Sequence, residues 1–456
     1  MFKIVFLTNI IRKMGIMQQT LTALQNENKI SEKSACLWIT GNTEWENEWS
    51  KNLGSADIVL IKWMGTGMDN PFLKKCQHFL EANKIKYFID ADDMKNNDFI
   101  KGFNQKQIDL IRRYMSFGGY ENYYNLWLYL DACLNKTDST VPEPNPVCWC
   151  GIYHPEAGKV YSDLQEYKNK FCNENKMTAG VLFYRDEWIW GDLEYQNRLI
   201  KEIEKQGMNV ICVFTNGMPV EELGMPSLRR LFDMFFKENG ILAIDVLINV
   251  MKFSMTSSGS ITIEDLKELN VPVLQAYSVI APYDEWKNSL EGLNAMEISI
   301  SVTLPEFDGI IHGVPIANKK ILDNGDVRYL PINERIERIA SKAKKWGNLR
   351  RKANGSKKIA IIFHNYPPKN SNIGSALGLD TIESIRRLLH LLKERGYKVD
   401  FIPEDGKEFI KILTANATND RSLLTDRQIL NAEKISGEKY AEYFSSIEER
   451  VQSQYK

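Results

Sequence analysis

The sequence has no long hydrophobic run and no excess of charge of one sign. Its 456 residues include 58 lysine and arginine residues against 59 aspartate and glutamate residues, so the formal net charge is −1. A chain balanced in this way has no basic field to attract nucleic acid, and we expect no nucleic-acid partner. No run approaches the roughly 18 consecutive apolar residues that cross a bilayer, and we expect no membrane span.

The sequence also lacks the marks of a secreted, disulfide-bonded protein. The apolar start, MFKIVFLTNIIRKMG, is interrupted by Asn9, Arg12 and Lys13, and no small-residue cleavage site follows it. We therefore interpret it as a strand that enters a helix, and we predict a cytoplasmic location. The seven cysteines are odd in number and scattered, which argues against a disulfide framework.

Nucleotide-binding and hydrolase motifs are missing. There is no G-x-x-x-x-G-K-[ST] phosphate loop, and the Gly65-Thr66-Gly67 sequence lacks a third glycine. There is no G-x-S-x-G nucleophile elbow either. We therefore expect neither ATP binding nor serine hydrolysis by this chain.

Short apolar runs alternate with longer amphipathic segments along most of the chain. This alternation predicts a multi-domain α/β protein of successive parallel-sheet βαβ units, Rossmann-like or flavodoxin-like, with a helical C-terminal tail. The first ~140 residues offer strands at 3–8, 35–40, 56–63 and 85–92, and later runs at 245–253, 271–279 and 296–306 predict more. The expected parts are an N-terminal α/β domain (1–140), a linker (141–150), a second α/β domain (151–331), a basic connecting helix (332–356), the start of a third α/β domain (357–413) and an incomplete helical tail (414–456).

Two segments share one layout. Residues 177–216 and 357–403 each predict a buried strand, a polar loop, and a helix that follows an aspartate and ends near a glycine. The strands end in Phe183-Tyr184 and in Phe363-His364. The similarity is also compatible with two unrelated βαβ units. In both cases the loops lie beyond the carboxyl end of a strand, where α/β proteins bind ligands.

The candidate site residues come mainly from these loops. A neutral imidazole at His364 could accept a proton or bind a metal, although a histidine bonded within its own loop is the alternative. Tyr184 and Arg185 suit a flat, conjugated, acidic ligand; a surface Arg–Asp pair is the alternative. His154, held extended before Pro155, is a weaker metal candidate. The predicted set is His364 (catalytic), Tyr184, Arg185, Asn365, Tyr366, Lys369 and Gly374 (substrate-binding), and His154 and His364 (metal-binding).

Several segments, in order, resemble the large subunit of cobaltochelatase and the H subunit of magnesium chelatase. They are GGYEN (118–122), IYHP (152–155), LFYRDEW (182–188), LNVPVLQAYS (269–278), TLPEFDG (303–309), the long stretch 346–385 and GYKVDFIPEDG (396–406). The resemblance implies an ATP-dependent chelatase that inserts Co²⁺ or Mg²⁺ into a tetrapyrrole in cobalamin-type biosynthesis. It also implies that AAA+ partner subunits, and not this chain, bind ATP-Mg.

Members of that family are much longer than this chain. We therefore expect the N-terminal part of a large subunit, inactive alone. Three explanations are open: a truncated piece of a longer chain, a split gene whose separate C-terminal half is a further partner, or a decayed copy. The alternatives are a non-catalytic tetrapyrrole carrier or scaffold, and a two-lobed α/β enzyme similar to glycosyltransferases.

Overall fold

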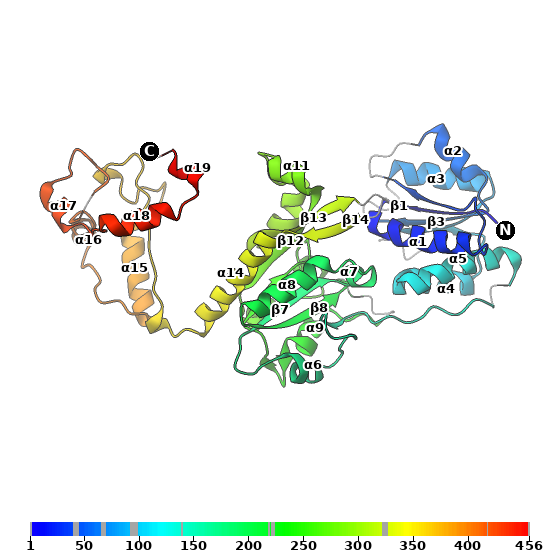
Figure 1. Cartoon of the computed structure of the whole chain (residues 1–456), viewed down its shortest axis with the longest axis horizontal. Helices are drawn as coiled ribbons and strands as arrows, with labels where there is room; N and C mark the ends of the chain where they lie inside the picture. Colours follow the sequence, from blue (N-terminus) through cyan, green and yellow to red (C-terminus); the bar gives the residue numbers. More distant parts are fainter. Residues whose placement is uncertain are drawn as a thin grey trace. The chain divides into compact units, whose positions relative to one another are not determined.

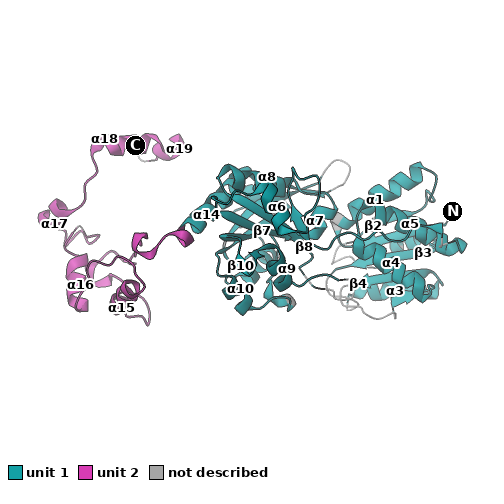
Figure 2. Cartoon of the chain, turned by 90° about the horizontal axis from the view of Figure 1, so that it is seen from below, with its two compact units in different colours: residues 1–348 teal, residues 349–456 magenta. Residues whose placement is uncertain are grey.

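The chain forms two compact units, residues 1–348 and 349–456 (Figures 1 and 2). The computed structural model describes residues 2–39, 45–64, 70–91, 99–137, 140–217, 219, 224–321, 327–416 and 418–454. Unit 1 contains both large sheets, whereas unit 2 contains helices and irregular segments. The α/β class predicted from the sequence is confirmed.

The first sheet of unit 1 has five strands in the order β2-β1-β3-β4-β5. Its first four strands are parallel, and β5 pairs antiparallel with β4 at one edge. The strands are β1 (Ile4–Thr8), β2 (Ala35–Trp38), β3 (Ile58–Trp63), β4 (Lys86–Ala91) and β5 (Ile100–Lys101). The four strands predicted in this region are therefore confirmed.

Alternate residues of these strands enter two different cores. In β1, Ile4 and Phe6 pack on one face, while Val5 and Leu7 pack on the other. This is the period-two pattern of a strand that is covered on both sides. One face is covered by α1 (Ile11–Asn26), α4 (Gln105–Phe117) and α5 (Tyr120–Asn135), the other by α2 (Asn47–Gly54) and α3 (Pro71–Ala82) (Figure 1).

The second sheet has seven strands in the order β14-β13-β12-β11-β7-β8-β6. The five central strands are parallel, and the two edge strands, β14 and β6, are antiparallel to their neighbours. The strands are β6 (Gly151–Tyr153), β7 (Thr178–Tyr184), β8 (Asn209–Thr215), β11 (Val246–Asn249), β12 (Val273–Pro282), β13 (Ile311–Ile321) and β14 (Val327–Pro331). A small hairpin, β9 (Lys237–Glu238) with β10 (Ile241–Leu242), lies outside this sheet.

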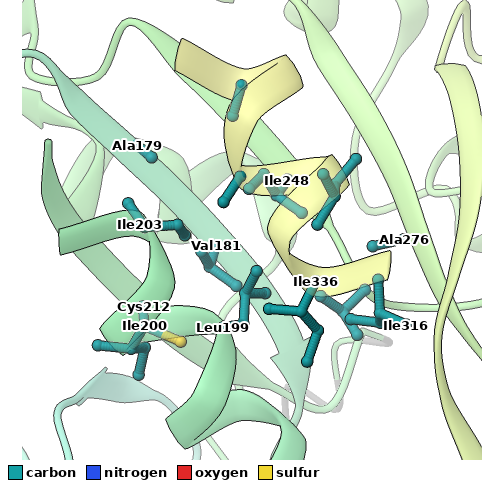
Figure 3. Close-up of a cluster of buried hydrophobic side chains, with 14 of the residues drawn as sticks. Ala179, Val181, Leu199, Ile200, Ile203, Cys212, Ile248, Ala276, Ile316 and Ile336 are labelled. Carbon is teal, nitrogen blue, oxygen red and sulfur yellow. The ribbon is translucent and has the colours of Figure 1, made fainter. Parts of the chain in front are cut away.

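Helices cover both faces of the second sheet. On one face, α8 (Glu194–Lys205) and α14 (Asn333–Arg351) enclose the cluster in Figure 3, which includes Val181, Leu199, Ile248 and Ile336. On the other face lie α6 (Leu164–Phe171), α9 (Leu228–Phe235) and α10 (Ile263–Leu269). The N-terminal half of the expected connecting helix thus belongs to the core of unit 1.

One strand predicted in unit 1 is wrong. Residues 296–306 fold as α12 (Ala295–Ile298), a π-helix (Ser299–Thr303) and α13 (Leu304–Phe307). The Asn294 side chain accepts a hydrogen bond from the Glu297 N–H at 2.9 Å and so starts a helix. The buried Glu297 carboxylate then accepts the Ile280 N–H at 2.6 Å, which fixes the helix beside β12. The alternating Ser, Ile and Val residues at 299–302 are compatible with a strand or a helix, and the Asn294 N-cap favours the helix.

Unit 2 contains α15 (Thr381–Glu394), α16 (Gly406–Leu413), α17 (Asp426–Asn431), α18 (Gly437–Ser445) and α19 (Glu449–Gln452). The predicted helical tail is confirmed. The strand predicted at 359–363 is wrong: within the described part of unit 2 no residue is in a strand, and Ile362 is 92% exposed. A parallel strand needs neighbouring strands to bond its N–H and C=O groups, and the described part of the unit offers none. Among all described residues, no helix is long and apolar enough to cross a membrane.

Candidate functional site

Each sheet of unit 1 has one position where the strand order reverses, between β1 and β3 and between β7 and β11. Open α/β sheets bind ligands beyond the carboxyl ends of the strands at such switch points. Both positions are bridged here. The Asn9 amide pairs with the main chain of Met64, at 2.7 and 2.9 Å, and the Tyr184 hydroxyl donates to the Lys252 carbonyl at 2.9 Å. Residues 183–188 therefore lie at a switch point, and they form the end of β7 and the short helix α7 (Arg185–Ile189) where a loop was predicted.

The Tyr184 side chain is fixed by contacts that its predicted role in binding substrate does not require. Burial raises the pKa of its phenol, and its hydroxyl is already bonded across the switch point. The aromatic face expected to stack on a ligand is half-buried. We therefore assign Tyr184 to the support of the β7–β11 edge.

Arg185 has a structural environment too, which corrects its predicted role. The side chain is only 2% exposed, and burial lowers the pKa of its guanidinium. The guanidinium donates to four carbonyl groups, those of Cys148 (2.8 Å), Phe117 (2.9 Å), Val147 (3.3 Å) and Ser116 (3.5 Å). It also lies 4.4 Å from the centre of the Trp149 ring. These contacts join the end of α4, the 147–149 segment and α7 (Arg185–Ile189), so they connect the two sheets.

The GGYEN segment contributes to the same junction. Gly118 and Gly119 turn the chain from α4 into α5 with φ values of 67° and 86°, which favour glycine. The buried Asn122 amide donates to the Gly118 carbonyl at 2.8 Å and to the Asn145 carbonyl at 3.0 Å. The predicted linker is thus fixed by side chains from both of its neighbours.

Two buried polar groups at the second switch point were missed from the sequence. The Glu187 carboxylate accepts hydrogen bonds from the Tyr195 hydroxyl (2.7 Å) and the Gln196 amide (2.6 Å). The Asn249 amide at the end of β11 donates to the Gln275 side chain at 2.9 Å. A polar residue inside an apolar run, such as Gln275 in VPVLQAYSV, was the available signal.

A cluster of charged side chains surrounds Tyr123 where the two sheets meet. Lys62 and Asp90 form an ion pair of 3.0 Å at the carboxyl ends of β3 and β4. The charges of Asp186, Lys62, Arg185 and Asp90 all act on the phenol of Tyr123, whose pKa is raised chiefly by burial. The Lys13 ammonium lies 5.8 Å from the centre of the Tyr123 ring. Residues from both sheets therefore meet around this tyrosine.

His154 is a buried histidine with both ring nitrogens in use, so the prediction that it binds a metal lacks support. Its Nδ1 accepts the Glu156 N–H at 3.2 Å, which places the proton of a neutral ring on Nε2. Nε2 lies 3.2 Å from the Glu204 carboxylate, and the ring packs 4.3 Å from that of Phe171. These contacts favour a structural role for His154.

The remaining predicted residues lie together in unit 2. His364, Tyr366 and Lys369 are exposed, and the rings of His364 and Tyr366 are 6.5 Å apart. The loop is closed by the Gly374 N–H, which donates to the His364 carbonyl at 2.8 Å. Gly374 has a φ of 70°, and a Cβ there would lie 3.1 Å from Phe363 and Thr381.

Two buried polar atoms lie in this loop and at the start of α15. Within the described part of the chain, the buried Asn365 Oδ1 and Thr381 Oγ1 have no hydrogen-bond partner. Buried polar atoms are normally bonded, so each one invites an explanation. The exposed imidazole of His364 thus lies next to a residue, Asn365, whose buried side-chain oxygen is unsatisfied.

No described group of three or more His, Cys, Asp or Glu side chains is arranged to bind a metal ion. Asp308, in the TLPEFDG segment, instead accepts hydrogen bonds from the Ser254 (2.7 Å) and Thr256 (2.6 Å) hydroxyls. It fastens the loop after β11 to the turn after α13. The side chain of His312 lies outside the described residues.

The comparisons with known proteins agree on one family. Residues 112–456 match the family model described as CobN/Magnesium Chelatase. An uncharacterized protein of Methanocaldococcus jannaschii is 38% identical over 75% of this chain and 29% of its own length. The aerobic cobaltochelatase subunit CobN of a Sinorhizobium species is 28% identical over 88% of this chain and 32% of its own. The chain belongs to the CobN/magnesium chelatase family.

A solved structure shares the fold. The catalytic subunit of cobaltochelatase from Mycobacterium tuberculosis superposes on 99% of this chain and 35% of that chain, with a TM-score of 0.56 and 21% identity. The chain thus spans about a third of the length of these relatives.

Proposed function

We propose that this chain is the N-terminal part of the large, tetrapyrrole-binding subunit of an ATP-dependent chelatase that inserts Co²⁺ or Mg²⁺ into a tetrapyrrole of the cobalamin type. The observation that carries the proposal is the family match over residues 112–456. The sequence has no phosphate loop, which supports a division of labour in which AAA+ partner subunits bind ATP-Mg. We predict that the complex works in the cytoplasm.

Within this proposal, His364 is the residue that acts on the metal or the ring. Metal insertion removes two pyrrole N–H protons and replaces water around the incoming ion. An exposed imidazole can serve as the base or as a transient ligand for the substrate metal. Asn365, Tyr366, Lys369 and Gly374 would bind the macrocycle on the same loop. Tyr184 and Arg185 would act indirectly, by holding the junction between the two sheets.

Exposed apolar side chains in unit 2 support an interaction with another polypeptide. Ile362 (92%), Phe401 (55%) and Ile359 (52%) are exposed in segments whose apolar pattern is typical of buried strands. Exposed apolar patches of this kind mark interaction surfaces. We infer that strands from the C-terminal region of a chelatase large subunit pair beside residues 358–363, and that the chain alone is inactive.

The first experiment compares ligands by tryptophan fluorescence, which ten tryptophans make sensitive. Quenching by a porphyrin, and not by a nucleotide sugar, is expected. The opposite result would favour the glycosyltransferase alternative.

The second experiment tests His364 in the assembled complex with the AAA+ subunits and a C-terminal polypeptide. We expect His364→Ala to lower the rate of metal insertion about 100-fold, the usual scale for a lost acid–base group. His390→Ala, on the exposed side of α15, is the matched control and should change nothing. Porphyrin binding without any metal insertion by the unmodified complex would instead favour the carrier alternative.

A further inference from the structure

Most of the buried residues of unit 2 lie in or against the His364 loop, residues 363–374. Within the part of unit 2 that the structure describes, the buried residues are Gly374, Pro403, Phe409 and Asp420. Gly374 closes the loop onto the His364 carbonyl, and the Phe409 ring lies 5.8 Å from the Phe363 ring. Asp420 bonds to the loop from 50 residues away in the sequence. Loops usually have few buried contacts, so their concentration at this loop invites a functional explanation.

Asp420 is a buried carboxylate whose hydrogen bonds join the tail to the loop. The residue is 8% exposed. Its Oδ2 accepts the Asn370 N–H at 3.2 Å, and its Oδ1 accepts the Ser422 hydroxyl at 2.6 Å and the Ser422 N–H at 3.2 Å. The hydrogen bonds from Ser422 and Asn370 outweigh the effect of burial and lower the pKa of the carboxyl below its ordinary value of 3.8. The group is therefore charged near neutral pH and accepts hydrogen bonds through both oxygens.

Thr418 adds a second connection at the same point of the loop. Its hydroxyl donates to the side-chain oxygen of Asn370 and accepts the Asp420 N–H at 3.1 Å. Both the main chain and the side chain of Asn370 are thus bonded to the tail.

Hydrogen bonds inside the loop extend this connection to His364. The loop contains a short 3₁₀-helix, Asn370–Asn372. The side-chain amide of Asn372 donates to the Pro367 carbonyl at 2.9 Å, and the Gly374 N–H donates to the His364 carbonyl at 2.8 Å. A displacement of the 3₁₀-helix would therefore also displace the main chain of His364.

We propose that Asp420 is a positioning residue for His364, and that it holds the His364 loop in the shape that metal insertion requires. The inference rests on the proposed function, because that function gives His364 its role. Asp420 contacts neither the metal nor the macrocycle in this proposal. A reacting group misplaced by about 1 Å can react about 100-fold more slowly, so a hydrogen bond at the other end of the loop can change the rate.

The first test measures insertion of Co²⁺ or Mg²⁺ into deuteroporphyrin IX by the complete complex with the AAA+ subunits and a C-terminal polypeptide. Asp420→Ala should lower the rate about tenfold, because it releases the loop. Asp420→Asn, which keeps one acceptor oxygen, should recover part of the loss. Glu433→Ala, at an exposed carboxylate of the same tail, is the matched control and should change nothing. An unchanged rate for Asp420→Ala would contradict the proposal.

A double variant separates positioning from a general loss of stability. If Asp420 acts through His364, then His364→Ala with Asp420→Ala should insert metal within about twofold of the rate of His364→Ala alone. If Asp420 only stabilises unit 2, the two losses should multiply, to about 1,000-fold, which would overturn the proposal.

Nuclear magnetic resonance tests the position of His364 without metal insertion. The full chain has five histidines, so labelling them with ¹³C gives five ring signals, and the signal that His364→Ala removes belongs to His364. Asp420→Ala should shift this signal and leave that of His390 in place, whereas Glu433→Ala should shift neither. An unmoved His364 signal would overturn the proposal even if the rate fell.

The two kinds of measurement distinguish the two proposals. If the unmodified complex inserts no metal, the proposed function fails, and the His364 signal still decides whether Asp420 positions the loop. If Asp420→Ala does not fold, Thr418→Val takes its place in every measurement, because it removes one hydroxyl from the connection and keeps the shape of the side chain.

Discussion

Residues 177–216 and residues 357–403 have the same predicted layout of strand, loop and helix, but they fold differently. In unit 1, the apolar run of β7 is buried between β8 and β11, and its helix α8 buries Leu199, Ile200 and Ile203. In unit 2, the run at 359–363 forms no strand, and its helix α15 has no buried residue. Both helices follow an aspartate and precede a glycine. Local pattern is therefore the same, and the presence of neighbouring strands makes the difference.

The largest difference should appear in amide hydrogen exchange. We expect the amides of 178–184 to be protected about 10⁴-fold or more, because they open only when unit 1 unfolds. The amides of 358–363, which have no ladder, should exchange within about tenfold of the unprotected rate. Equal protection of the two segments would show that residues 358–363 do pair, and the comparison would fail.

A matched pair of core truncations gives the next largest effect. Leu182→Ala removes a fully buried side chain and should lower the free energy of unfolding of unit 1 by about 2–5 kcal/mol. Ile362→Ala changes an exposed side chain and should cost less than about 0.5 kcal/mol. Urea titration measures the free energy of unfolding of both variants. The dependence of this free energy on urea concentration should stay unchanged, which checks that the unfolding transition is the same. A large loss from Ile362→Ala in the chain alone would indicate a hidden core in unit 2.

The polar loops after the two runs should also differ. Arg185→Met leaves four carbonyl groups at the junction without their donor and should cost about 2–4 kcal/mol. Arg185→Lys should recover only part of this loss, because an ammonium cannot reproduce the planar fork. Lys369→Met, at an exposed position, should stay within about 0.5 kcal/mol. Thermal or urea unfolding of the three variants tests this order, and a neutral Arg185→Met would remove the structural role assigned to Arg185.

The smallest effect concerns acid stability. Burial raises the pKa of Glu202 in α8, but hydrogen bonds from Arg198 and Gln206 outweigh it, so the pKa lies below its ordinary value of 4.5. A carboxylate with a lowered pKa stabilises the fold above pH 4.5, and this contribution is lost as the pH falls through its folded pKa. Glu202→Gln should therefore cost about 1–2 kcal/mol at pH 7 and flatten the loss of stability below pH 4.5.

Glu383 in α15 is the counterpart of Glu202. Hydrogen bonds from Arg386 and Arg387 lower its pKa to about 2, but all three side chains contact water. Glu383→Gln should leave the acid midpoint unchanged within error, because water screens exposed pairs. An equal response of the two variants would contradict the difference in burial between the two helices.

The sequence alone placed residues 183–188 correctly at the end of a parallel strand, because apolar periodicity is a local signal. It did not predict that residues 185–188 form part of a short helix. Arg185 donates to four carbonyl groups of residues between 116 and 148. These residues come near Arg185 only through the tertiary fold, so no local sequence signal specifies them. The contacts of His154 with Glu204 and Phe171 could not be predicted for the same reason, since they form only in the folded chain.

The sequence by itself determined the α/β class, the strands of the first sheet, the helical tail and the family resemblance. Tertiary structure alone decided that 359–363 stays unpaired and that Lys13 lies buried over Tyr123. Hydrophobic periodicity and helix capping depend on residues that are close together in the sequence, so they can be recognised from the sequence alone. Strand pairing and the burial of charge depend on segments tens to hundreds of residues apart, so only the folded molecule settles them.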